Sequence, residues 1–141
     1  IGGGTGSDTA ALATPRLAAA LPTLPAGSFV GIALGTNDAT TGVPVATFKA
    51  QLQQMITSIK GSGRTPMLAR TSWSLNPNLP RYVQAIDELR AANGLPPGPD
   101  LYTHFQSHPE ELKADRVHPT ATGERSIQRL WAEAVARAYG R

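Results

Sequence analysis

An acidic residue and a histidine stand three positions apart near the C-terminal end of the sequence, in a turn closed by a proline. They are Asp115 and His118, in the stretch Asp-Arg-Val-His-Pro. A carboxylate at this spacing can accept one imidazole N–H and leave the other ring nitrogen free to take a proton. The pair is therefore a candidate general base with the group that orients it. The structural alternative is a helix start, where aspartates and exposed histidines are common.

A second polar block, Gly-Thr-Asn-Asp at residues 35–38, directly follows a short apolar run. The amide NH₂ of Asn37 could donate a hydrogen bond to a developing oxyanion, a contact worth about 2.7–4 kcal/mol. The structural alternative is an ordinary turn, because Asn and Asp end many strands by bonding loose backbone groups. The glycine run at residues 1–4 offers backbone N–H groups that no side chain obstructs, and these could serve the same oxyanion.

The composition predicts one globular domain over residues 1–141, with 40% hydrophobic and 16% charged residues. No apolar run approaches the roughly 18 to 20 residues that span a bilayer, so we expect no membrane span. The net charge of +3 is scattered along the chain, which does not favour nucleic acid as a partner. The absence of cysteine excludes disulfides and a cysteine nucleophile but leaves the compartment open. Of the two compartments, we favour secretion over the cytoplasm.

Short apolar runs alternate with segments of helical periodicity. The runs at residues 28–34 and 66–70 predict buried strands. Helices are expected after a cap at Asp8 or Thr9 and over residues 45–60, 81–92 and 121–139, while residues 95–117 are expected to be irregular. This alternation predicts a parallel sheet between helices, an α/β fold of three layers. Ligands of such sheets bind beyond the carboxyl ends of the strands, where the block at 35–38 and the loop at 71–80 fall.

The three motifs in this order resemble the SGNH, or GDSL-type, hydrolases along essentially the whole chain. IGGGT, GTND and DRVHP stand where that family has a glycine turn, a Gly-x-Asn-Asp motif and a terminal Asp-x-x-His. The resemblance implies a flavodoxin-like α/β/α sandwich of five parallel strands and the hydrolysis of acyl or acetyl esters without a cofactor. Small-molecule, carbohydrate or lipid esters would be the substrates. His118 would be the general base, Asp115 its orienting carboxylate, Asn37 the side-chain oxyanion donor and Gly3 the backbone donor, with Gly4 as the alternative register.

The nucleophile of that family is missing from this sequence. It belongs to a Gly-Asp-Ser block after the first strand, and no Gly-Asp-Ser occurs among the 141 residues. Ser7 follows the glycine turn instead of preceding it, and it is rejected as the nucleophile because serines near helix starts commonly serve as caps. Loss of an interior strand would leave about five backbone pairs unmade at about 1–3 kcal/mol per group, more than a typical domain stability of about 5–15 kcal/mol. Either the first strand and the nucleophile lie upstream of Ile1, or the protein does not have this fold, and we favour the first.

Two other functions stay open at this point. A non-catalytic binding module would keep the crevice and lack the nucleophile. Metal-dependent phosphoester hydrolysis would need about six protein ligands for two ions, and the sequence does not offer them. His104 and His108 would share a face only on a helix, and Pro109 argues against one continuing there, so no metal site is expected. Trp73 could line a substrate pocket, although packing is favoured.

Overall fold

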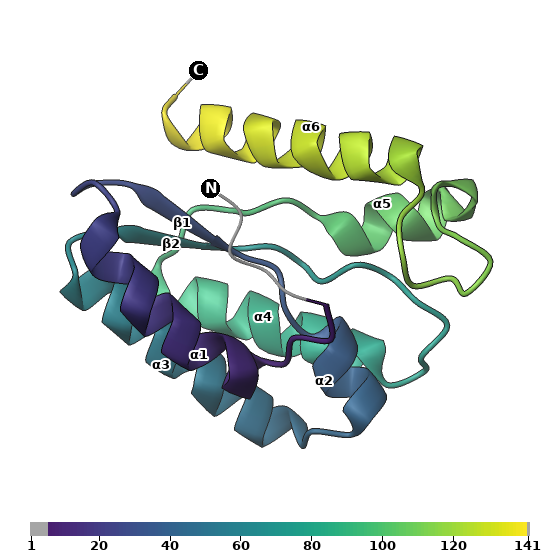
Figure 1. Ribbon diagram of the computed structural model, residues 1–141, viewed down its shortest axis with the longest axis horizontal. Coiled ribbons are helices and arrows are strands. Elements are labelled where there is room, and N and C mark those ends of the chain that lie inside the picture. Colours follow the sequence, from purple (N-terminus) through teal and green to yellow (C-terminus); the bar gives the residue numbers. More distant parts are fainter. Residues whose placement is uncertain (1–5, 141) are drawn as a thin grey trace.

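The computed structural model describes residues 6–140 and places helices on both faces of a parallel sheet (Figure 1). Strand β1 (Phe29–Ile32) pairs in parallel with β2 (Thr65–Leu68), with Phe29 opposite Thr65. Figure 1 shows one face covered by α1 (Ala10–Ala20), α3 (Val45–Gly61) and α4 (Leu79–Asn93), and the other by α6 (Ala121–Ala138). The shorter elements are η1 (Leu21–Thr23), α2 (Thr36–Thr41), α5 (Leu101–Ser107) and η2 (Pro109–Glu111). The predicted α/β class is confirmed.

The long helices follow the periodicity of their sequences. In α3 the buried side chains recur at helical spacing, namely Phe48, Leu52, Met55, Ile56 and Ile59. Helix α1 begins after Thr9, whose side chain accepts from the Leu12 N–H, and α6 begins after Thr120, which accepts from the Gly123 N–H. Helix α4 ends at Gly94, whose φ of 59° gives the left-handed stop that Asn-Gly predicts. The predicted helices at 45–60, 81–92 and 121–139 are confirmed to within two residues.

The sheet differs from the five strands that the resemblance implies, because residues 6–140 form two strands and one further parallel bridge. That bridge joins Arg70 to Asp100, and the Arg70 N–H donates to the Pro99 carbonyl at 3.0 Å. The segment beside β2 is rich in proline, and Pro96, Pro97 and Pro99 have no N–H to give to a ladder. It follows the sheet edge without becoming a regular strand.

Two glycines allow close packing against the sheet. A Cβ at Gly98 would lie 2.2 Å from the Leu68 carbonyl oxygen, so only glycine lets the proline-rich segment approach β2. A Cβ at Gly31 would lie 2.8 Å from the Trp131 ring. The glycine therefore allows α6 to pack closely against β1. Trp131 and Trp73 are partly buried and pack against a second apolar cluster, which includes Phe105. Packing, the role favoured for Trp73, is the one observed.

The prediction that residues 95–117 are irregular is wrong for the middle of that stretch, which forms α5 and η2. Asp100 starts α5, because its Oδ1 accepts from the Thr103 N–H at 3.0 Å. The buried side chains of this short helix are Leu101 and Phe105, and two apolar residues give too weak a period to be read from sequence. No helix in residues 6–140 combines the length and the apolar character needed to cross a bilayer.

Candidate active site

The sequence motifs gather at one end of the molecule. Figure 1 shows β1 and β2 pointing toward the end that holds α2, the loop after β2 and the segment between η2 and α6. This is the carboxyl end of the parallel strands, where α/β sheets place their ligands. The block at 35–38 begins α2, and the Asp115–His118 turn directly precedes α6.

The turn at residues 115–118 is built around the carboxylate of Asp115. Its Oδ1 accepts from the backbone N–H groups of Val117 at 2.9 Å and His118 at 3.0 Å, and its Oδ2 lies 2.8 Å from His118 Nδ1. The His118 backbone N–H, the imidazole and the Val117 N–H together hold the pKa of Asp115 well below its usual range. An ionised carboxylate only accepts, so Nδ1 carries the proton and Nε2 holds the free lone pair. The predicted contact between the two residues is confirmed.

This pair is exposed, with the His118 side chain 69% and the Asp115 side chain 49% accessible. Arg116 has a φ of 57°, and its N–H donates to the Lys113 carbonyl at 2.9 Å. The Lys113 N–H donates in turn to the His118 carbonyl at 2.8 Å and closes the loop on itself. The local hydrogen bonds therefore fix the shape of the turn and leave the imidazole open to solvent.

Glu111 anchors the turn to the body of the protein. Its carbonyl oxygen accepts from the Thr120 N–H at 2.8 Å and from Thr120 Oγ1 at 3.0 Å, so residues on either side of the turn are joined. Its carboxylate lies 2.8 Å from His104 Nε2, and these two side chains are only 14% and 12% exposed. The hydrogen bond with His104 is the main reason that the pKa of Glu111 is lowered, and Ser126 donates to the same carboxylate. Nothing in the local pattern of residues predicts this contact across seven positions.

Asn37 lies in the first turn of α2 and points back toward the start of the chain. Gly35 precedes the first residue of α2, and its φ of 127° strongly favours glycine. The amide Nδ2 of Asn37 donates to the Asp8 carbonyl at 3.0 Å. A carboxamide has two N–H donors, so the second is available to another acceptor. Gly3 and Gly4, the expected backbone donors, lie outside the described residues.

The burial of Asp38 was not predicted from the sequence. Its side chain is fully buried. Its two carboxylate oxygens lie 3.0 and 3.3 Å from the Ala10 N–H, which begins α1. Burial raises the pKa of Asp38, while N–H groups led by Ala10 oppose that rise. Neighbouring Thr36 bonds Thr71 Oγ1 at 2.8 Å and so ties α2 to the loop after β2. The 35–38 block thus joins three segments of the chain.

The structure forms two separate clusters from the predicted site residues. One joins Asp115 to His118, and the other joins Asn37 and Asp38 to residues 8–10. Between residues 6 and 140, no hydrogen bond or ion pair connects Asn37 to Asp115 or His118. Thr9, one of the two residues predicted to cap α1, is the observed cap, and Ser7 lies two positions before it.

A match to a family model shows which protein family the chain belongs to. A model of the GDSL-like lipase/acylhydrolase family matches residues 2–125, which include all three motifs except Ile1 of the first. The chain belongs to this family. Membership supports ester hydrolysis as the general activity of this GDSL-like protein, with small-molecule esters as the class of substrate.

Solved structures agree with the fold of the family. An acetyl xylan esterase variant, Axe2-W215I from Geobacillus stearothermophilus, superposes with a TM-score of 0.80 at 16% identity over 92% of this chain and 68% of its own. The psychrotrophic esterase EstA from Pseudoalteromonas sp. gives 0.81 at 17% identity over 96% of this chain and 75% of its own. TesA gives 0.71 at 27% identity over 89% of this chain and 71% of its own. No curated protein matches the sequence significantly.

Metal ligands do not cluster in the described part of the chain. No group of three or more His, Asp or Glu side chains in residues 6–140 could hold a metal ion. His104 and His108 do lie close, with ring centroids 4.8 Å apart, but each bonds a different glutamate. Each of these imidazoles is therefore engaged by a carboxylate of its own.

Proposed function

We propose that this GDSL-like protein is a serine esterase in which His118 is the general base and Asp115 its orienting carboxylate. Asn37 and the backbone N–H of Gly3 would stabilise the oxyanion. The nucleophile would be the serine of a Gly-Asp-Ser block that the 141 residues do not contain. The observation that carries the proposal is the 2.8 Å contact between His118 Nδ1 and an ionised Asp115.

The chemistry follows the roles of these groups in acyl transfer. The serine oxygen attacks the ester carbonyl carbon while His118 Nε2 takes the hydroxyl proton, and Asp115 stabilises the imidazolium. The second N–H of Asn37 and the N–H of Gly3 bind the oxyanion of the tetrahedral intermediate. His118 then gives its proton to the leaving alcohol. A water molecule, deprotonated by the same imidazole, releases the acid and restores the serine.

Short acyl groups, acetyl among them, are the substrates we propose. The side chain of His118 is 69% exposed, so its imidazole lies in an open environment. A long acyl chain gains its binding energy from buried apolar contact, which an open site does not provide. The acetyl xylan esterase among the structural neighbours is consistent with this choice.

The first experiment is N-terminal sequencing with an intact mass of the natural protein, followed by a chromogenic acetate assay. A Gly-Asp-Ser ahead of Ile1, together with turnover, is the expected result. His118→Ala should then lower kcat by about 10⁴-fold or more, because general-base and nucleophile activation act as one unit.

The matched control is His108→Ala, because His108 is also exposed and its Nδ1 lies 3.1 Å from a neighbouring carboxylate, that of Glu110. This control should keep the activity of the parent protein. Equal turnover in the parent and in His118→Ala would refute the assignment. A natural protein without Gly-Asp-Ser and without turnover would instead support the binding-module alternative.

A further inference from the structure

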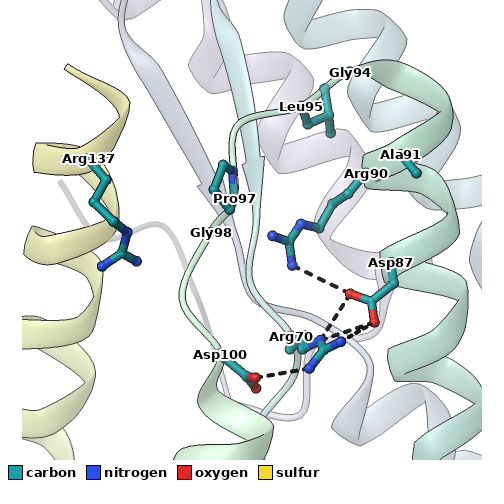
Figure 2. Close-up of a pocket in the computed structure, with 10 residues that line it drawn as sticks. All are labelled: Arg70, Asp87, Arg90, Ala91, Gly94, Leu95, Pro97, Gly98, Asp100 and Arg137. Atoms are coloured by element: carbon teal, nitrogen blue, oxygen red, sulfur yellow. Dashed lines mark hydrogen bonds and ion pairs between the residues drawn. The ribbon is translucent and has the colours of Figure 1, made fainter. Parts of the chain in front are cut away.

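A pocket of about 630 Å³ lies beside the proline-rich edge of the sheet, and the candidate active-site residues do not line it. Figure 2 shows its walls, which come from α4, residues 94–100 and the last turn of α6. On α6, Arg137 is more than four turns beyond Ala121, a distance of about 24 Å along the helix axis. The pocket is therefore separate from the Asp115–His118 turn, which precedes the first turn of α6.

One arginine of the pocket is fixed by two carboxylates. Arg70 Nη2 lies 2.6 Å from Asp87, and Arg70 Nη1 lies 3.0 Å from Asp100. The hydrogen bond with Asp87 is the main reason that the pKa of Arg70 is raised above its usual range. This ion cluster links β2, α4 and the start of α5, so Arg70 has a structural role and is not available to a ligand.

Two other arginines of the pocket have guanidinium N–H groups that are not engaged by a carboxylate. Arg90 reaches Asp87 through Nη1 alone at 3.5 Å, which leaves most of its guanidinium uncommitted. The guanidinium of Arg137 makes no hydrogen bond or ion pair with any residue from 6 to 140. Figure 2 shows the two side chains reaching toward residues 94–100 from opposite sides. Three arginines against two aspartates leave this pocket with one positive charge in excess.

We propose that this pocket binds an organic carboxylate with a small apolar body. A single negative charge would balance the excess positive charge, and the planar guanidinium forks of Arg90 and Arg137 match the geometry of a carboxylate. Ala91, Leu95 and Pro97 form the apolar part of the lining. The volume lies within the range of about 300–1,000 Å³ in which small-molecule sites fall.

The test is an NMR titration of the uniformly ¹⁵N-labelled natural protein, with any segment that precedes Ile1, using benzoate as the probe and benzamide as its neutral isostere. Benzoate should cause saturable shifts in the amides of residues 91–98 and in the Nε–H signals of Arg90 and Arg137. Benzamide should bind about tenfold more weakly, because it lacks the charge that strengthens a hydrogen bond to guanidinium. Benzamide binding as tightly as benzoate would overturn the proposal, as would the absence of saturable shifts in residues 91–98.

A matched pair of variants on α6 tests whether benzoate binds in the pocket beside Arg137. Arg137→Gln should weaken benzoate about fivefold, the size expected for one exposed charge. Arg129→Gln, which removes an exposed arginine paired with Glu133 on the same helix, should leave benzoate binding unchanged. Both positions are on the surface, so both variants should fold, and far-UV circular dichroism checks this. Equal binding by the parent and Arg137→Gln would refute the proposed role of the pocket.

Discussion

The two clusters of the candidate active site are held in opposite ways. The Asp115–His118 pair is exposed, and its hydrogen bonds run within four consecutive residues. The Asn37–Asp38 pair sits against residues 8–10, and its contacts cross 28 and 29 positions of sequence. The turn at residues 115–118 needs only the hydrogen bonds among its own residues to keep its shape. The second cluster exists only when α1 and α2 are packed together, so the two should respond differently to mutation.

Asp115→Asn should have the largest effect and should act on catalysis alone. An amide cannot stabilise the imidazolium and favours the wrong tautomer of His118, so kcat should fall by about 10⁴-fold. The exposed carboxylate contributes little to folding, so the thermal midpoint should stay near that of the parent. A steady-state assay with a thermal melt measures both. Loss of folding together with activity would contradict the idea of a self-contained turn.

The dependence of kcat/KM on pH tests whether Asp115 is ionised during catalysis. Because the pKa of Asp115 is held well below its usual range, this carboxylate stays ionised throughout the working range of an esterase. A steady-state pH profile should therefore show no fall of kcat/KM in acid that reports protonation of Asp115.

Asn37→Ala should lower kcat by about 10²–10³-fold, the usual cost of one oxyanion donor. It also removes the hydrogen bond to the Asp8 carbonyl, so a small loss of stability should accompany the loss of rate. Kinetics and urea denaturation separate the two effects. An unchanged kcat would show that the second N–H of Asn37 does not face the reacting ester.

Asp38→Ala should act on folding first. The substitution leaves the Ala10 N–H without its buried acceptor, which should lower the free energy of unfolding by about 1–3 kcal/mol. Activity should fall only in proportion to the folded fraction. Urea denaturation followed by circular dichroism measures the loss. A stability equal to that of the parent would contradict the role given to the buried carboxylate.

Glu111→Gln should have the smallest effect, with a pH dependence that identifies it. The pKa of Glu111 is lower in the folded protein than in the unfolded chain, so its stabilisation is complete above the unfolded value of about 4.3. That stabilisation disappears as the pH falls through the folded pKa. The variant should be less stable than the parent by about 1 kcal/mol at pH 7 and equal to it in strong acid.

The control for this variant is Glu110→Gln, which alters the neighbouring exposed pair with His108. Urea denaturation at several pH values should show no comparable difference there. A pH-independent loss in Glu111→Gln would contradict the contact of an ionised Glu111 with His104.

Part of the fold and of the site was predictable from local pattern. Helices α3, α4 and α6 follow from helical spacing and from residues such as Gly94 and Thr120. The contact of Asp115 with His118 follows from a spacing of three residues in a turn. Helix α5 was missed because its two buried side chains carry too little periodicity. The burial of Asp38 was missed because nothing in its neighbours indicates that α1 will cover it.

The amino-acid sequence alone determined the α/β class, the order of the motifs and the turn that aims His118. Those features depend on residues that are a few positions apart, so local interactions and hydrophobic periodicity are enough to specify them. Tertiary structure decided that Asn37 and Asp38 would hold the start of α1, that Glu111 would meet His104, and that two arginines would face one pocket. Contacts of this kind join segments that are remote along the chain, and only packing of the whole domain brings them within hydrogen-bond distance.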